Sequence, residues 1–330
     1  MFSLRQTFIE MTGLLLLGLL ILAVAIADSL QQFIQLPSAV YQMNMIFLSI
    51  LIEALPFVLI GVLIAGLIQI FITDRHIERW IPKNRFAAIL MSCIVGACFP
   101  ACECGIVPIV RRLVSKGVPI YAGAGFLLTG PLINPLVILS TYMAFGNDAR
   151  IAFWRMGTGF IIALAVSLVI SCFCKNSQLT VPAKLSCIQN HGQQGFLEKL
   201  ISTLKHSVDE FFSMGKFLIL GALAAAFFQT YVSTEDFAAA GTGPASSIAV
   251  MMGLAYILSL CSEADAFIAA SFSNLFPAAA VMSFLVYGPM LDLKNTLMML
   301  SVFKIKFVVF FSLLVTAAVF FAMLLFQQFT

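Results

Sequence analysis

An all-α membrane protein with several crossings is the fold class that this sequence predicts, and three observations predict it. Of its 330 residues, 61% are hydrophobic and only 10% are charged, whereas soluble domains carry about 25% charged residues. Too little polar surface remains to cover a soluble particle, which excludes a soluble enzyme. The apolar stretches are continuous runs, unlike the short alternating segments of a membrane β-barrel. A net charge of only +3, with no dense basic patch, also argues against nucleic acid as a partner.

Uncharged runs long enough to cross a membrane recur along the whole chain. A helix of about 20 apolar residues crosses a hydrocarbon layer of about 30 Å, because a backbone in lipid must satisfy its own hydrogen bonds. We therefore expect about seven to nine membrane segments. The runs without Asp, Glu, Lys or Arg are 11–27, 29–52, 54–73, 86–102, 117–147, 156–174, 217–234, 237–262, 266–291 and 307–330.

The first run is expected to remain attached as an N-terminal transmembrane helix, residues 1–35. Ala25-Ile-Ala27 resembles a signal-peptidase site, but a single Arg ahead of the run and many spans behind it favour an uncleaved helix. The N-terminus is placed in the cytoplasm, and the protein in the bacterial inner membrane.

An internal repeat follows that helix. Residues 119–134 and 277–292 align without a gap at Pro, Ala, Phe, Leu, Gly and Pro, and Asn134 aligns with Asp292. In each copy a glutamate precedes the aligned Gly-Pro pair by 25 to 27 residues. Together these matches predict two homologous halves.

The halves are expected to comprise residues 41–174 and 207–330, joined by a cytoplasmic linker, 175–206. Basic side chains lie on both sides of residues 86–110. Both clusters stay in the cytoplasm only if this stretch dips into the membrane and returns. Each half then keeps an odd number of full crossings, which makes the halves antiparallel, as in transporters with inverted repeats and interrupted helices. The alternative is a chain of simple crossings.

Three cysteines around a helix breaker form the most informative motif. Cys98, Cys102 and Cys104 stand at i, i+4 and i+6, with Pro100 between them. Thiolates select soft ions, so these cysteines are predicted to bind substrate and are candidate ligands of a soft metal or metalloid. No second Cys or His pair completes a zinc signature. The alternative is that the thiols only pack as small buried side chains.

Carboxylates inside the apolar runs give a second signal. A charge at the bilayer centre costs about 2.5–3.5 kcal/mol, so such residues usually serve a pathway or a proton relay. Glu103, Glu263 and Asp265 are therefore predicted to couple transport to protons. The alternative is that they pair with Lys294 or Arg111, or lie at an interface.

A Gly-Pro motif in each half predicts a second broken helix. Pro and Gly release backbone groups that can coordinate a substrate where they line a cavity. The alternative is a proline kink followed by a capped helix. The predicted substrate-binding residues are Gly130, Pro131 and Asn134 in the first half and Gly288, Pro289 and Asp292 in the second.

The motifs Cys98-Phe-Pro-Ala-Cys-Glu-Cys-Gly105 and Gly130-Pro-Leu-Ile-Asn-Pro135 resemble those of the ArsP and YraQ-like predicted permease family. The resemblance covers nearly the whole chain after the first helix. ArsP-type members export trivalent organoarsenicals, so the resemblance implies a soft, thiol-seeking substrate. It assigns the site to Cys98, Cys102, Glu103, Cys104, Gly130, Pro131 and Asn134.

The sequence as a whole predicts a proton-coupled efflux permease for a metalloid or organometal, not an enzyme. Its expected partners are the lipid bilayer and a small-molecule or metalloid substrate, with self-association into a homo-oligomer left open and no cofactor expected. Phosphate-loop, metalloprotease and serine-hydrolase motifs are missing from the sequence. The alternatives are an anion or small-metabolite carrier with packing thiols, a thiol–disulfide oxidoreductase that uses Cys102 and Cys104, and an accessory subunit.

Overall fold

A computed structural model describes residues 38–71, 81–82, 84–99, 102–174, 178–180, 196–231 and 243–328. The predicted N-terminal helix lies outside the described residues, as do Pro100 and most of the predicted linker. Regular structure within them is helical, apart from an isolated antiparallel bridge between Leu179 and Phe303. The predicted all-α class is confirmed.

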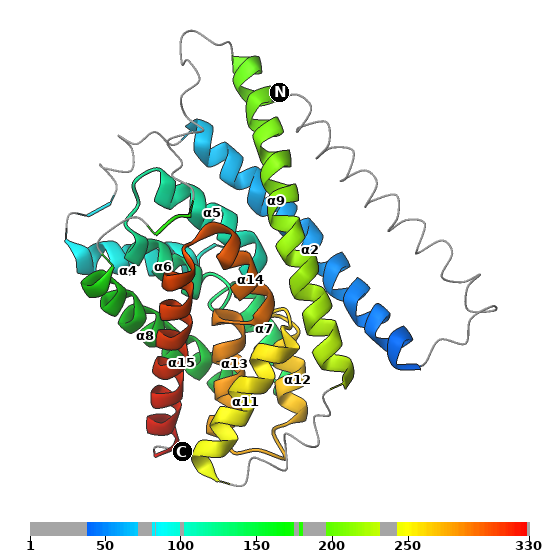
Figure 1. Cartoon of the computed structure of the whole chain (residues 1–330). Helices are drawn as coiled ribbons and strands as arrows, with labels where there is room; N and C mark the ends of the chain where they lie inside the picture. The colour runs from blue at the N-terminus through cyan, green and yellow to red at the C-terminus, as the bar shows by residue number, and fades with distance from the viewer. Residues whose placement is uncertain are drawn as a thin grey trace.

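The helices follow the uncharged runs of the sequence (Figure 1). The two longest, α2 and α9, lie side by side along one flank of the molecule. The described helices are α2 (Ser38–Phe71), α4 (Arg85–Ala97), α5 (Glu103–Ser115), α6 (Ile120–Thr129), α7 (Pro135–Ala144), α8 (Ala149–Phe173), α9 (Phe196–Tyr231), α11 (Pro244–Leu258), α12 (Asp265–Ser271), α13 (Ala278–Met290), α14 (Leu293–Val302) and α15 (Ile305–Gln327).

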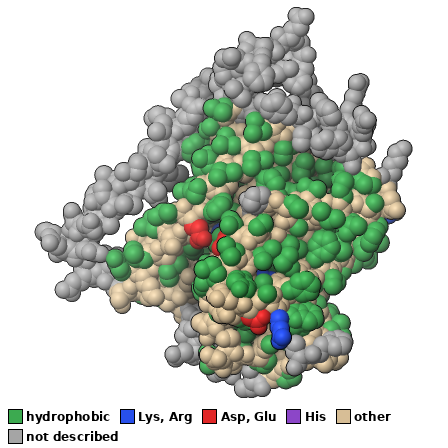
Figure 2. Space-filling model, turned by 180° about the vertical axis from the view of Figure 1, so that it is seen from behind, with side chains coloured by type: hydrophobic (Ala, Val, Ile, Leu, Met, Phe, Trp, Pro, Cys, Tyr) green, Lys and Arg blue, Asp and Glu red, His purple; other side chains and the backbone are tan. Residues whose placement is uncertain are grey.

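Four of these helices are long and apolar enough to cross a membrane: Ser38–Ile68, Ala149–Phe173, Ser207–Tyr231 and Ile305–Gln327. Hydrophobic side chains dominate the face drawn in Figure 2, and few charged side chains reach it. Such a surface is suited to lipid rather than to water. The chain is therefore a polytopic membrane protein.

Four short helices, α4 to α7, lie between α2 and α8, and four more, α11 to α14, lie between α9 and α15. In each set, irregular backbone separates the first helix from the second and the third from the fourth. The predicted break after Cys98 is present, because α4 ends at Ala97 and α5 begins at Glu103. The break predicted at Gly130 is also present, between α6 and α7. The break predicted in the second copy is also present, between α13 and α14, and it is shorter than the first. Gly288 and Pro289 belong to the last turn of α13, which ends at Met290. Pro289 lacks the N–H of one helix hydrogen bond, and the helix ends one residue later.

The packing of the short helices follows the same order in both parts of the chain. Helix α4 packs against α6 and α8, and α11 packs in the same way against α13 and α15. Helix α5 packs against α14, and α7 packs against α12. The first part, α2 to α8, and the second part, α9 to α15, therefore interlock through their short helices.

Side-chain caps fix where the helices restart after a break. The Asn134 side chain accepts a hydrogen bond of 3.0 Å from the amide of Leu136 at the start of α7. The Asp292 side chain accepts one of 2.6 Å from the amide of Asn295 at the start of α14. These bonds satisfy amides that a helix start leaves without a partner.

Candidate functional site

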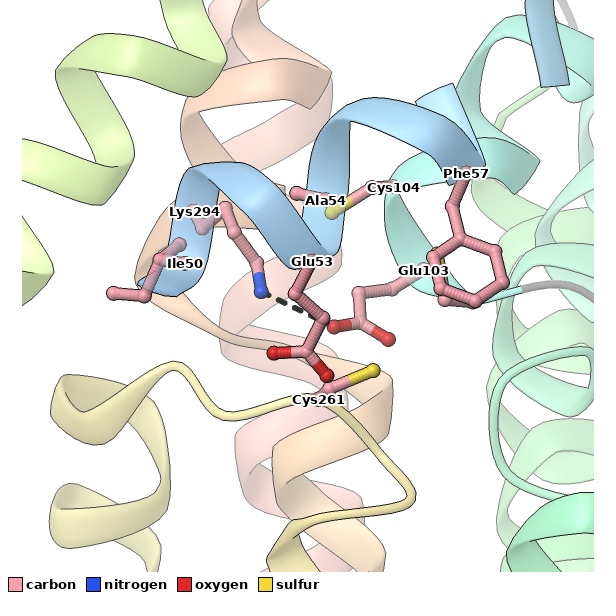
Figure 3. Close-up of a pocket in the computed structure, with 9 residues that line it drawn as sticks. Ile50, Glu53, Ala54, Phe57, Glu103, Cys104, Cys261 and Lys294 are labelled. Carbon is pink, nitrogen blue, oxygen red and sulfur yellow. Dashed lines mark ion pairs between the residues drawn. The ribbon is translucent and has the colours of Figure 1, made fainter. Parts of the chain in front are cut away.

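A small pocket lies where α2, α5 and α14 meet the turn between α11 and α12 (Figure 3). It has room for about one water molecule. Glu53 stands near the middle of the apolar span Ser38–Ile68 of α2, so the pocket lies at the mid-depth of that span. The residues that line it are Ile50, Glu53, Ala54, Phe57, Cys102, Glu103, Cys104, Cys261 and Lys294.

Two glycines place α2 against the start of α5. A side chain at Gly61 would overlap the carbonyl oxygen of Gly105, so the two backbones touch where neither has a side chain. Phe57 lies one turn earlier on α2, and its carbonyl oxygen also lies against Gly105. This contact places Glu53 of α2 beside Cys102, Glu103 and Cys104 at the start of α5.

Lys294 is the electrostatic centre of the site, and its side chain is buried. Its Nζ lies 3.4 Å from Glu103 Oε1 and 3.6 Å from Asp292 Oδ2. It also donates a hydrogen bond of 3.2 Å to the carbonyl oxygen of Ser259. One ammonium therefore faces two buried carboxylates, and Figure 3 shows its ion pair with Glu103.

The two carboxylates that face Lys294 are incompletely paired. Glu103 is only 2% exposed, and neither of its oxygens hydrogen-bonds to a described residue. Asp292 Oδ2 is also buried and has no hydrogen-bond partner among the described residues. Buried acceptors without partners are costly, so this side of the pocket is suited to an additional donor, proton or cation.

The pocket also gathers three thiols from two parts of the chain. Cys102 and Cys104 are buried at the start of α5. Cys261 comes from the turn after α11, and its Sγ donates a hydrogen bond of 2.8 Å to Glu263 Oε2. Cys98 is exposed after the end of α4 and does not line the pocket. In the described part of the chain, no three Cys, His, Asp or Glu side chains are arranged to hold a metal ion.

The structure brings together only part of the predicted site. Cys102, Glu103 and Cys104 line the pocket, and Asp292 contacts it through Lys294. Asn134 acts as the cap of α7, the role that the alternative interpretation gave it. The predicted residues that do not line the pocket are Cys98, Gly130, Pro131, Asn134, Gly288, Pro289, Glu263 and Asp265.

Two of the predicted proton-coupling carboxylates already have partners. Both oxygens of Asp265 accept hydrogen bonds from Arg155 Nη2, at 3.0 and 2.9 Å. Glu263 accepts the hydrogen bond from Cys261. Glu103 and Asp265 occupy corresponding places, since each opens a helix after a break, but only Glu103 faces the pocket.

The sequence indicated Lys294 only as an alternative partner of the carboxylates, and the structure shows that pairing with Glu103. Arg155 and Cys261 were not assigned to the site from the sequence. Arg155 had a usable signal, because it is the one charged residue between Ile151 and Phe173 in the sequence, and a charge inside a membrane span is usually functional. Cys261 carried no pattern of its own, because no second cysteine lies near it in the sequence.

Comparison with known proteins agrees with this architecture. Residues 39–328 match the ArsP-type family model that is described as "Predicted permease". A Bacillus subtilis protein, YcgR, is 51% identical over 271 residues, which cover 82% of this chain and 92% of that protein. A Streptococcus mutans protein named "Putative two-component membrane permease complex subunit" is 43% identical over 279 residues, or 84% of this chain and 93% of that protein. No solved structure matches the chain.

Proposed function

Because the chain belongs to this predicted permease family, we propose that it exports a soft, thiol-seeking solute from the bacterial cytoplasm across the inner membrane. The observation that carries the proposal is the set of three buried thiols, Cys102, Cys104 and Cys261, on one pocket. The solute class is a trivalent organoarsenical or a similar metalloid compound, since soft centres prefer sulfur ligands.

Binding at these thiols needs no redox partner. When a trivalent arsenic hydroxide meets a thiol, an As–S bond replaces an As–O bond, and the hydroxide leaves as water with the thiol proton. A monoorganoarsenical with two hydroxides can make two such exchanges, one with a thiol of α5 in the first part and one with Cys261 in the second, and each releases one water. Cys261 thus takes the place that the sequence gave to Cys98.

Alternating access follows from the same arrangement. The repeated order of helix packing supports two antiparallel repeats, residues 41–174 and 207–330, that move against each other around a site between them. The pocket has room for about one water molecule, so a larger solute enters only when the two parts separate. The structure then corresponds to a closed state between the two openings.

Proton coupling is proposed to depend on Glu103. Its oxygens have no hydrogen-bond partner among the described residues, and Lys294 supplies only one positive charge for Glu103 and Asp292. Glu263, bonded to the Cys261 thiol, links this acidic group to the solute. Asp265 is held by Arg155 and is the least suited of the predicted carboxylates to exchange protons.

A second subunit is the competing proposal, favoured by one observation. The streptococcal relative is named as a subunit of a two-component permease complex. If this chain works in the same way, it needs a partner before it transports anything. Transport by the purified protein alone in liposomes would exclude that requirement.

The test of the proposed function is the intracellular arsenic content of cells given methylarsenite. We expect wild-type protein to lower it, Cys102→Ser/Cys104→Ser and Cys261→Ser to abolish the effect, and Cys98→Ser to behave as wild type. Cys98→Ser is the matched control, because that thiol lies outside the pocket. Equal arsenic in every strain, with the protein confirmed in the membrane, would remove the thiol-seeking solute from the proposal.

A further inference from the structure

Arg155 is a buried cation that lies outside the pocket and yet contacts the segment that carries one of its thiols. The residue belongs to α8, and it is 1% exposed. Its Nη1 donates a hydrogen bond of 2.7 Å to Thr141 Oγ1 on α7. Its Nη2 reaches both carboxylate oxygens of Asp265 and lies 3.3 Å from the carbonyl oxygen of Ser262.

The segment that Arg155 holds is the turn between α11 and α12, residues 259–264. The turn starts at Ser259, whose φ of 48° places it in the left-handed region, and such a conformation persists only when the surroundings hold it. Lys294 supplies that support, because its amide bonds to Ser259 Oγ and its Nζ bonds to Ser259 O. At the other end of the turn, Arg155 binds Ser262 O.

Cys261 therefore lies between two cationic anchors. We infer that Arg155 is a positioning residue for the thiol pocket: it fixes the end of the 259–264 turn and so presents the Cys261 thiol to the site. The inference rests on the proposed site, and it concerns the geometry of the turn rather than a contact with solute. Asp265 completes the anchor and is assigned to positioning in place of proton transfer.

The guanidinium group suits this task better than an ammonium would. Arginine offers several N–H donors in a fixed plane, and here they reach three residues at once: Thr141, Ser262 and Asp265. A lysine could keep the charge beside Asp265 but could not hold all three partners. The three partners belong to α7, α12 and the turn, so the anchor also joins the first part of the chain to the second.

Another ion pair between the two parts provides a matched control. Glu210 on α9 binds Arg111 and Arg112 at 3.1 and 2.6 Å. Glu210 is buried, as Asp265 is, but within the described part of the chain no hydrogen bond or ion pair joins Glu210, Arg111 or Arg112 to the 259–264 turn. A change at Arg112 should therefore loosen the fold without moving Cys261.

The experiment measures how fast N-ethylmaleimide alkylates Cys261 in the purified full-length protein, by mass spectrometry of the peptide. The variants are Arg155→Lys, Arg155→Met and Arg112→Met, with the thermal unfolding midpoint recorded for each. Buried Cys93 on α4 is the internal control thiol. No solute is needed, so the result stands whichever outcome the arsenic experiment gives.

We expect Arg155→Met to speed alkylation of Cys261 by about tenfold, the effect of losing one charged anchor on a buried segment. Arg155→Lys should give an intermediate rate, and it keeps the test valid if Arg155→Met does not fold. Cys93 in the same samples, and Cys261 in Arg112→Met, should react at the wild-type rate. An unchanged Cys261 rate in folded Arg155→Lys and Arg155→Met overturns the inference, as does an equal increase in Arg112→Met.

Discussion

Lys294 and Glu103 form a buried ion pair between α14 and α5, with Nζ and Oε1 3.4 Å apart. The pair is looser than a direct hydrogen bond, and the same ammonium is shared with Asp292. It stands on the wall of the pocket beside the thiols. The charged centre of the protein is thus made by two helices that belong to different parts of the chain.

Removing the ammonium should be more harmful than removing the whole pair. Lys294→Met leaves Glu103 and Asp292 buried without a cation, and we expect it to cost about 3–5 kcal/mol of unfolding free energy. Lys294→Met/Glu103→Gln should recover part of that loss, because one of the two charges is gone. Denaturant unfolding in detergent measures both. Equal losses in the single and double variants would show that the pair does not govern stability.

Replacing the pocket carboxylate should separate coupling from binding. With Glu103→Gln in proteoliposomes, we expect accumulation of methylarsenite driven by a pH gradient to fall to the equilibrium level, while downhill flux remains. Asp148→Asn is the control, because Asp148 is exposed and caps α8. Accumulation at the wild-type level in Glu103→Gln and Glu263→Gln would contradict proton coupling through these residues.

The contact between α2 and α5 should tolerate no side chain. Gly61→Val inserts atoms where the Gly105 backbone already lies, and overpacking of this kind costs about 1–3 kcal/mol. Gly215→Ala on α9 is the matched control, since a Cβ there meets nothing within 4 Å and alanine favours a helix by about 0.5–1 kcal/mol. Thermal unfolding of the two variants should therefore shift in opposite directions. A stable Gly61→Val protein would refute the close contact.

The role of Asn134 can be separated from a role in the site. Asn134→Ala removes the cap of α7, and we expect a loss of about 1 kcal/mol in stability with solute export retained. Asn134→Asp keeps an acceptor for the Leu136 amide and should restore the stability. Loss of export by a fully stable Asn134→Asp protein would return this residue to the substrate site.

The sequence predicts the fold through features that act locally. Apolar runs, Gly-Pro pairs and the Asn134 and Asp292 positions all mark where helices run, break and restart, because helix length and capping depend on neighbouring residues. The end of α13 shows the limit of this reasoning, because Gly288 and Pro289 themselves remain helical. Pro289 alone does not stop a helix that already has its preceding turns.

The sequence predicted only those residues of the candidate site that are close together in the chain. Cys102, Glu103 and Cys104 form one motif, and the structure places all three on the pocket. Cys261 and Lys294 join them only because α5 packs against α14 and Lys294 of α14 bonds to the 259–264 turn. That packing depends on contacts across most of the chain, and neither residue has a local pattern that reveals it.

Replacing Glu53 should disturb the pocket less than replacing its other charged residues. Glu53 is exposed and makes no hydrogen bond or ion pair with the described residues, whereas Lys294 both neutralises carboxylates and supports a turn. Exchanging Lys294 therefore disturbs charge and shape together. Redesign of the permease for a different cargo should begin at Glu53, where a new side chain changes the chemistry of the pocket and leaves its framework in place.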